Sequence, residues 1–301
     1  MEIITVEAEK TEQNEFRILP KESHPNYRLW ANYSKFARDR GELVADILQS
    51  FTPIVNRKIL DIGCGDGGTA LALSARGAEV TAIDLDLKRV QKLEHAASLL
   101  NSNLMVLEGN AEKLYFNDET FEVIILQDVI EHLPNPHLAA KEAARVLKRQ
   151  GLIYISTPNR WSPFNFVADP HWALPFMSIL PRNGVAFFMT RLIRRETRVR
   201  RDFAALLSLF KIRRLFQKQS IRLQFVNKKI AEQLFTRPKA VVNSDIHLKV
   251  VELIRASKLQ DVFCGLVNDE FGFFNYFVNP TWYLIGRKLK SQHKGHQDTL
   301  S

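Results

Sequence analysis

Cysteine is scarce in this sequence, and long apolar runs are missing. Only two cysteines occur, Cys64 and Cys264, and they form no Cys-x-x-Cys pair. This excludes a disulfide framework and a structural zinc site, so no metal site is expected, and it fits a reducing compartment. No apolar run reaches the roughly 18 residues of a simple membrane-spanning helix. The acidic start lacks the basic-then-apolar order of a signal peptide, so we expect a cytoplasmic location.

Charge is unevenly distributed along the chain. Residues 1–150 contain 18 Lys and Arg against 23 Asp and Glu, a net of −5, whereas residues 151–301 contain 24 against 10, a net of +14. Thirteen of the cations lie between Arg191 and Lys229, opposed only by Glu196 and Asp202. The two halves are therefore expected to meet different partners.

Short apolar runs alternate with helical patterns through most of the chain. Runs of this kind, nearly continuous in apolar residues, are typical of parallel strands covered on both faces. The alternation predicts an α/β fold with a doubly wound sheet. The expected strands are 57–63, 79–84, 103–109, 121–129, 152–158, 261–267 and 281–288, and the expected helices are 27–51, 67–76, 87–100, 135–151 and 247–260.

This rhythm stops between about residues 160 and 245, where proline-rich turns precede a basic helical stretch. Such an interruption in a regular α/β unit is typical of a substrate-binding cap. We therefore expect N-terminal tail and helices over 1–55, a core formed by 56–160 and 246–290, and an inserted helical, basic cap at 161–245.

The stretch "DIGCGDGG" raises the question of which ligand the core binds. Gly63, Gly65 and Gly68 fit the G-x-G-x-x-G turn of dinucleotide-binding proteins. However, Asp61 precedes the turn and would repel a pyrophosphate, and no lysine or arginine lies between Lys58 and Arg76. A carboxylate suits a ligand with a sulfonium cation and an ammonium group. Dinucleotide binding remains the alternative.

Two further positions concern the same ligand. Asp84 ends the second expected strand, where an acid can accept hydrogen bonds from both ribose hydroxyls of either ligand. Asn110 and Ala111 follow the third strand, where a small polar pair can meet an adenine edge.

The segments "ILDIGCGDGG", "VTAIDLD", "EGNAEKLYF", "FEVIILQDVIEHLPNP" and "GLIYISTPN" resemble, in this order, the class I S-adenosylmethionine-dependent methyltransferases. They resemble above all the type 11 branch with the ubiquinone-biosynthesis O-methyltransferases, over about 55–160 and 246–289. The resemblance implies a seven-stranded Rossmann-like sheet whose last strand is antiparallel, with S-adenosyl-L-methionine as cofactor. The cofactor-binding residues it implies are Asp61, Gly63, Cys64, Gly65, Asp84, Leu85, Asn110, Ala111 and Gln127.

Two histidines are candidate catalytic residues. His171, in "ADPHWALP", stands beside Asp169, which could orient the imidazole, and Trp172, which could cover an apolar acceptor. The same turn is also compatible with an aspartate that only caps the backbone. His132 follows the fourth strand, where the pair Glu131-His132 either takes part in catalysis or orders the turn. The acceptor itself stays open, because the segment after Pro158 departs from the ubiquinone enzymes.

The basic stretch has several interpretations. Phe203, Leu206, Leu207 and Phe210 would share one helical face, and residues 191–229 could then dock on an anionic membrane, making the protein membrane-peripheral. Alternatively the apolar face packs on the core. The expected function is O-methylation of a small-molecule or lipid-linked, quinone- or glycan-like acceptor. The alternatives are an RNA methyltransferase, in which the basic cap binds nucleic acid, and a non-catalytic scaffold with this fold.

Overall fold

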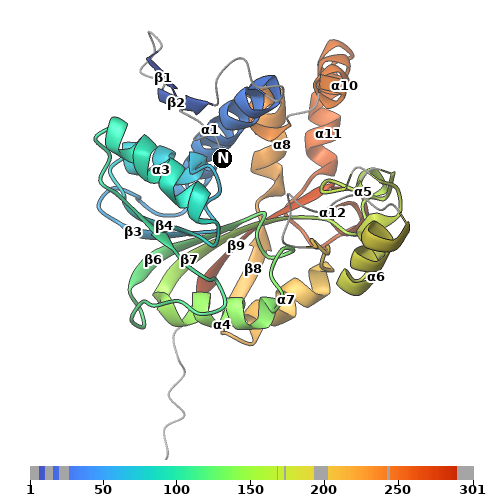
Figure 1. The fold of residues 1–301 in the computed structure, drawn as a ribbon. Helices are drawn as coiled ribbons and strands as arrows, with labels where there is room; N and C mark the ends of the chain where they lie inside the picture. Colours follow the sequence, from blue (N-terminus) through green and yellow to red (C-terminus); the bar gives the residue numbers. More distant parts are fainter. Residues whose placement is uncertain are drawn as a thin grey trace, which may run out of the picture.

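The protein is built around one seven-stranded sheet with helices on both faces (Figure 1). The computed structural model describes residues 7–10, 16–19, 27–167, 169–172, 174–192, 203–242 and 245–289. The strands are β1 (Glu7–Lys10), β2 (Phe16–Leu19), β3 (Lys58–Ile62), β4 (Glu79–Asp84), β5 (Leu104–Glu108), β6 (Phe121–Gln127), β7 (Leu147–Pro158), β8 (Ile221–Phe225) and β9 (Thr281–Lys288).

The helices fall mostly between these strands. The α-helices are α1 (Tyr27–Gln49), α2 (Gly68–Ala75), α3 (Leu87–Leu99), α4 (Pro136–Val146), α5 (Pro163–Val167), α6 (Arg182–Phe187), α7 (Leu209–Gln217), α8 (Asn227–Thr236), α9 (Pro238–Val241), α10 (Asp245–Ala256), α11 (Gln260–Leu266) and α12 (Phe273–Phe277). Two short segments of other helix types are η1 (Met177–Ile179) and η2 (Phe188–Leu192). None of the described helices is both long and apolar enough to cross a membrane.

The order of strands in the main sheet is β5-β4-β3-β6-β7-β9-β8. Neighbours from β5 to β7 are parallel, and β9 runs antiparallel to both β7 and β8. The seven-stranded doubly wound sheet with an antiparallel last strand is therefore confirmed. Because β3 and β4 lie at adjacent positions and run in the same direction, their carboxyl ends meet at one edge of the sheet.

Successive residues of each strand point to opposite faces and divide the core in two. Ile59 packs with α1 and α2 on one face, whereas its neighbour Leu60 packs with α4 and α7 on the other. Figure 1 shows the same layers, with α1, α3 and α8 on one side of the sheet and α4 and α7 on the other.

Helices α1 and α2 cross at two glycines. A Cβ atom on Gly41 would lie 2.3 Å from the carbonyl oxygen of Gly68, and one on Gly68 would lie 2.2 Å from the carbonyl oxygen of Ala37. Any side chain at these positions would force the helices apart. This crossing fixes α1 against the start of α2, the helix that follows the glycine-rich loop.

Three predicted elements differ from the structure, one of them the strand expected at 152–158, which already begins at Leu147. Helix 135–151 ends earlier, at Val146, because Leu147 already pairs with Phe121 of β6 and Gln150 has a left-handed φ of 60°. The predicted strand 261–267 is wrong, since α11 occupies most of that segment. A short apolar run such as "DVFCGLV" does not distinguish strand from helix by periodicity alone.

The prediction of one separate cap over 161–245 needs correction. The strand that completes the sheet, β8, lies within that segment and pairs with β9. Helix α7 also belongs to the core, because its apolar residues Leu209, Ile212 and Phe216 are buried with those of α4 and β8. Of the segment expected to form the cap, α5, η1 and α6 lie apart from the sheet, together at one end of it (Figure 1).

The expected amphipathic helix starts later than the sequence suggests. Helix α7 begins at Leu209, where the Ser208 side chain accepts a hydrogen bond from the backbone of Lys211. Residues 203–208 form no helix, Leu206 and Leu207 are buried, and Phe210 is 70% exposed. The four apolar residues therefore do not share one exposed face. Part of the basic stretch, residues 193–202, lies outside the described residues.

Candidate functional site

The glycine-rich loop connects β3 to α2 at the carboxyl edge of the sheet. Gly63, Gly65 and Gly67 all have left-handed φ angles, of 70°, 55° and 77°. Side chains rarely adopt this conformation, so glycine is required for the loop to fold back on itself. The backbone NH groups of Gly63 and Cys64 donate to the carbonyl of Ile83, which ties the loop to β4.

Asp61, near the end of β3, lies beside this loop in an unusual environment. It is 2% exposed, and its Oδ2 accepts no hydrogen bond from the described residues. Burial, together with the nearby charge of Asp84, raises its pKa to about 7. A buried carboxylate without a donor is costly, and a cationic ligand group would compensate it. The residues therefore fit a ligand with a positively charged end, as S-adenosylmethionine has.

Asp84, the last residue of β4, is hydrogen-bonded to the glycine-rich loop. Its Oδ2 accepts a hydrogen bond of 2.9 Å from the backbone of Gly65, and its Oδ1 one of 2.9 Å from that of Asp86. Each carboxylate oxygen has further lone pairs, so the group can still accept hydrogen bonds from a ligand. Nη1 of Arg89 in α3 lies 3.8 Å from Oδ2 of Asp84. The loop therefore has a cation nearby, although residues between Lys58 and Arg76 include no lysine or arginine.

The remaining predicted cofactor residues surround the same edge. Leu85 follows β4 and is 69% exposed, and Asn110 and Ala111 follow β5, with Ala111 buried. Asn110 accepts a hydrogen bond from the backbone of Glu112, which shapes that turn. Gln127 ends β6, and its Oε1 accepts a hydrogen bond of 2.8 Å from Thr69 of α2. All of them thus come from the carboxyl ends of adjacent strands.

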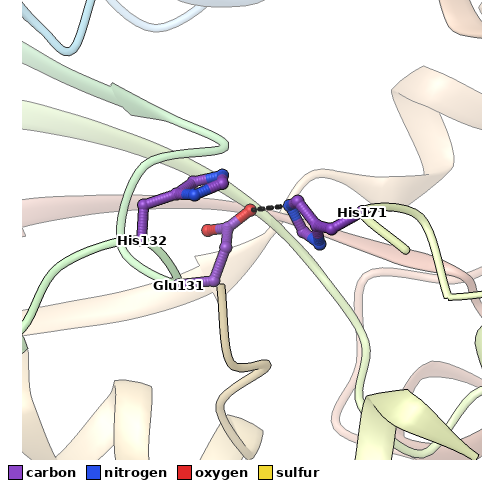
Figure 2. A group of neighbouring side chains, drawn as sticks. All are labelled: Glu131, His132 and His171. Atoms are coloured by element: carbon purple, nitrogen blue, oxygen red, sulfur yellow. Dashed lines mark ion pairs between the residues drawn. The ribbon is translucent and has the colours of Figure 1, made fainter. Parts of the chain in front are cut away.

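A second group of polar side chains lies after β6. Glu131 is fully buried, and its Oε2 accepts a hydrogen bond of 2.9 Å from Thr157. Its Oε1 accepts none and lies 3.7 Å from Nε2 of His171 (Figure 2). The ring of His132 stands edge to face with that of His171, with centroids 4.8 Å apart. Burial and the charge of Asp128 raise the pKa of Glu131.

The structure thus brings together the predicted residues His132, His171 and Asp169. Asp169 Oδ1 accepts hydrogen bonds from the backbones of His171 and Trp172, as a capping aspartate does, and also lies 3.7 Å from Nδ1 of His171. These hydrogen bonds are those of a capping aspartate, and the distance of 3.7 Å to the imidazole is longer than a hydrogen bond, so an orienting role for Asp169 stays a prediction. The turn also carries His171 back to the carboxyl edge of β6.

Residues that the sequence analysis did not single out hold this group in place. Arg182 of α6 donates to the carbonyls of three successive residues, Glu131, His132 and Leu133. Buried Arg40 of α1 lies 3.3 Å from Asp128, which also accepts a hydrogen bond from Ser156. These contacts join segments distant in sequence, and no local pattern could have indicated them.

The sheet order, the left-handed glycine loop and the acids at the ends of β3 and β4 are the arrangement that the resemblance to the class I S-adenosylmethionine-dependent methyltransferases implied. Residues 60–155 match the family described as "Methyltransferase domain". The chain therefore contains a methyltransferase domain of this class, whose cofactor is S-adenosylmethionine.

Relatives and solved structures agree with this assignment. The chain is 35% identical over 133 residues to a ubiquinone biosynthesis O-methyltransferase of Albidiferax ferrireducens, covering 43% of this chain and 52% of that protein. The protein of the same name from Pseudomonas syringae is 29% identical over 163 residues, 52% and 68% of the two chains. The chain spans about half the length of the first of these relatives.

Among solved structures, an S-adenosylmethionine-dependent methyltransferase from Mesorhizobium loti superposes with a TM-score of 0.52 at 13% identity. The superposition covers 80% of this chain and 96% of that one, and it supports the fold alone.

Proposed function

We propose that the protein is an enzyme that transfers a methyl group from S-adenosylmethionine to an oxygen of a small-molecule or lipid-linked acceptor. The observation that carries this proposal is Asp61, a buried carboxylate with an oxygen lacking a donor beside three left-handed glycines. A pyrophosphate would be repelled there, and a cationic ligand end would be attracted.

The protein's contribution is mainly to bind and align. When bound, S-adenosylmethionine supplies a methyl group already activated on a sulfonium sulfur. Asp61 would accept hydrogen bonds from the ammonium end, Asp84 from the ribose hydroxyls, and Gln127 would flank the sulfur. Hydrogen bonds from Gly65 to Asp84 and from Gly63 and Cys64 to Ile83 already order the loop, which lowers the entropy lost on binding.

The acceptor side of the site is assigned to Glu131, His132 and His171. A hydroxyl acceptor must lose its proton as the new bond to carbon forms, and this group supplies a buried carboxylate and two imidazoles for that task. Glu131 and His132 follow the strand that ends in Gln127, and His171 contacts both of them, so the group lies at the end of the sheet where the cofactor is expected. The names of the relatives, which refer to ubiquinone biosynthesis, support an oxygen acceptor.

A lipid-linked acceptor is supported by a surface around α5. Trp161, Phe164 and Val167 recur every three residues and are 50%, 57% and 69% exposed. Phe176 joins them, since its backbone bonds to Phe166 and it is 56% exposed. We call these four residues the α5 surface. Tryptophan and phenylalanine beside an arginine, here Arg160 over the ring of Trp161, suit an anionic bilayer interface. This surface, instead of the buried face of α7, is the proposed membrane contact.

The acceptor class is tested with methyl-labelled S-adenosylmethionine. Purified protein is incubated with an extract of its source organism, which is then separated into lipid, polar small-molecule and RNA fractions, with Asp84→Ala as the control. We expect label in the lipid or small-molecule fraction. Label in RNA would replace this proposal with RNA methylation through the cations of α7, and no label in any fraction would favour a non-catalytic scaffold.

A further inference from the structure

Arg160 lies at the end of the sheet where the acceptor is expected. It follows the last residue of β7 by two positions, and Thr157 of that strand donates a hydrogen bond to Glu131. Three residues of extended chain span at most about 11 Å, so Arg160 is close to Glu131. Nη2 of Arg160 donates to the carbonyl of Ile179 in η1, which ties the side chain to that segment.

Arg160 has a donor and a charge that the described residues do not satisfy. Its Nε is buried and donates to no acceptor in the described part of the chain. Burial lowers the pKa of Arg160, and no described carboxylate lies near enough to oppose that shift. Arg76, which is also partly buried, is paired with both Glu42 and Asp46. A partly buried guanidinium without a counter-ion is costly, and an anion would compensate it.

The neighbours of Arg160 supply no negative charge. The ring centroid of Trp161 lies 5.4 Å from the central carbon of the guanidinium. An aromatic face stabilises a cation without neutralising it, so the charge remains available to a ligand. Ser178, next to Ile179 in η1, is fully buried, and its hydroxyl has no hydrogen-bond partner among the described residues. Two segments that contact each other therefore each contain a buried donor without an acceptor.

We propose that Arg160 binds an oxyanion, a phosphate or carboxylate group, carried by the methyl acceptor. The identity of the ligand rests on the proposed function, whereas the anion site does not. The planar guanidinium can donate two parallel hydrogen bonds to the oxygens of such a group, which an ammonium cannot do in the same geometry. The acceptor would thus be held at two points, with its hydroxyl near Glu131 and His171 and its anionic group at Arg160.

This contact would make the site selective for anionic acceptors. An anionic acceptor satisfies the guanidinium, whereas a neutral analogue of the same size leaves it buried and unpaired. Sites with a buried polar group reject analogues that lack its partner far more strongly than apolar pockets reject a missing methylene. Because Trp161 belongs to the α5 surface, an anionic lipid headgroup offers the same chemistry from a second source.

Anion binding is measured first, on the full chain without acceptor or cofactor. Inorganic phosphate and acetate are titrated separately at constant ionic strength, with chloride as the balancing anion, while tryptophan fluorescence is followed. We expect a saturable change in the wild type for at least one of the two anions, and Trp161→Phe should abolish the change because the ring lies against the guanidinium.

Variants of Arg160 test whether the anion binds at this residue. Arg160→Gln should bind the anion at least about tenfold more weakly, since a charge-assisted hydrogen bond is lost. Arg160→Lys, which keeps the charge but not the planar group, should bind with intermediate affinity. Arg149→Gln is the control, because it removes an exposed cation near the other end of β7, and it should bind like the wild type.

The midpoint of urea unfolding is a second readout that does not depend on fluorescence. The anion should raise the midpoint of the wild type more than that of Arg160→Gln, because a ligand of the native state stabilises it beyond the general effect of the salt. Equal affinity in the wild type and Arg160→Gln would overturn the anion site. So would a wild type with neither a saturable fluorescence change nor the larger shift of the midpoint.

A further comparison identifies the source of the anion. If the acceptor carries it, Arg160→Gln should bind S-adenosylmethionine like the wild type but need more extract to reach the same rate of methyl transfer. Loss of binding to phosphatidylglycerol vesicles with unchanged methyl transfer would instead assign the anion to a lipid headgroup and overturn the acceptor contact. Anion binding without any methyl transfer would leave the site standing and remove the proposed function.

Discussion

Asp84 is the residue whose loss should affect cofactor binding most directly. Asp84→Ala should weaken S-adenosylmethionine binding by about ten- to a hundredfold, because hydrogen bonds to a charged acceptor contribute about 1.5–3 kcal/mol. Equilibrium dialysis with labelled cofactor measures this. Asp84 also accepts the backbone NH groups of Gly65 and Asp86, so Asp84→Asn, which keeps an acceptor oxygen, is the matched variant. Unchanged affinity in Asp84→Ala would contradict the ribose assignment.

Asp61 should make cofactor affinity depend on pH. Its pKa in the folded protein is about 7, so the carboxylate is largely protonated at pH 6 and ionised at pH 8. The ligand's ammonium group attracts only the ionised form, and affinity should therefore rise between these values. Asp61→Asn should bind weakly and lose that rise. Fluorescence titrations over this range measure it, and an identical slope in the variant would exclude Asp61 as the cause.

The same residue has the opposite effect on stability. Because its folded pKa is raised above the ordinary value of 3.8, the native state binds the proton more tightly than the unfolded state does. Its contribution is therefore present below pH 4 and is lost as pH rises toward 7. Asp61→Asn should raise the midpoint of urea unfolding relative to wild type at pH 8 and have little effect at pH 4.

Among elements, the crossing of α1 and α2 is the most sensitive to added volume. Gly41→Ala should destabilise the protein by about 1–3 kcal/mol, because the new methyl group meets backbone atoms that cannot move aside. Gly265 of α11 is the control, since a Cβ there meets nothing within 4 Å. Gly265→Ala should be neutral or stabilise by up to about 1 kcal/mol. Equal unfolding midpoints for the two variants would mean that α1 does not pack as described.

Vesicle binding by variants distinguishes the α5 surface from α7 as the membrane contact. Wild-type protein should sediment with vesicles containing anionic lipid, and Phe164→Ser should reduce the bound fraction. Phe210→Ser is the control, because Phe210 of α7 is 70% exposed but lies outside the α5 surface. Loss of binding in Phe210→Ser alone would move the contact to α7, and no wild-type binding would remove the membrane proposal.

Elements with strong local patterns could be predicted from the sequence, and those decided by tertiary pairing could not. The strands from β3 to β6 are apolar runs that end in, or are followed by, glycine or acidic residues, and they appear within one or two residues of their expected bounds, whereas β7 begins at Leu147, earlier than the expected 152. In contrast, "DVFCGLV" is helical and "IRLQF" is the edge strand β8. The first is a short apolar run, which does not distinguish helix from strand, and the second alternates apolar and polar residues as a strand does but lies within the stretch expected to be a helical cap.

The residues of the site also divide into those that could be predicted from the sequence and those that could not. The glycines, Asp61 and Asp84 follow one another at strand ends, so topology alone predicts that they meet. The contact of His171 with Glu131 depends instead on how the turn after α5 folds back, and Arg182 contributes from a third segment. Sequence spacing contains no information on such distances, which is why the sequence left open whether Glu131 and His132 take part in catalysis or only order the turn.

Over the whole molecule, acidic and basic residues are concentrated in different halves of the chain. The acidic first half supplies the carboxylates of the cofactor site, and the basic second half supplies exposed cations, such as Lys211, Arg213 and Arg214 on α7. The cations on α7 would attract anionic partners, whereas the carboxylates of the cofactor site would repel phosphates.

The central claim is that the glycine-rich loop binds S-adenosylmethionine and not a dinucleotide. It is tested most directly by isothermal titration calorimetry, with S-adenosylmethionine and NADH titrated separately into the full chain at pH 8, where Asp61 is ionised. We expect one molecule of S-adenosylmethionine bound per chain and no heat of binding for NADH. Saturable binding of NADH without binding of S-adenosylmethionine would contradict it.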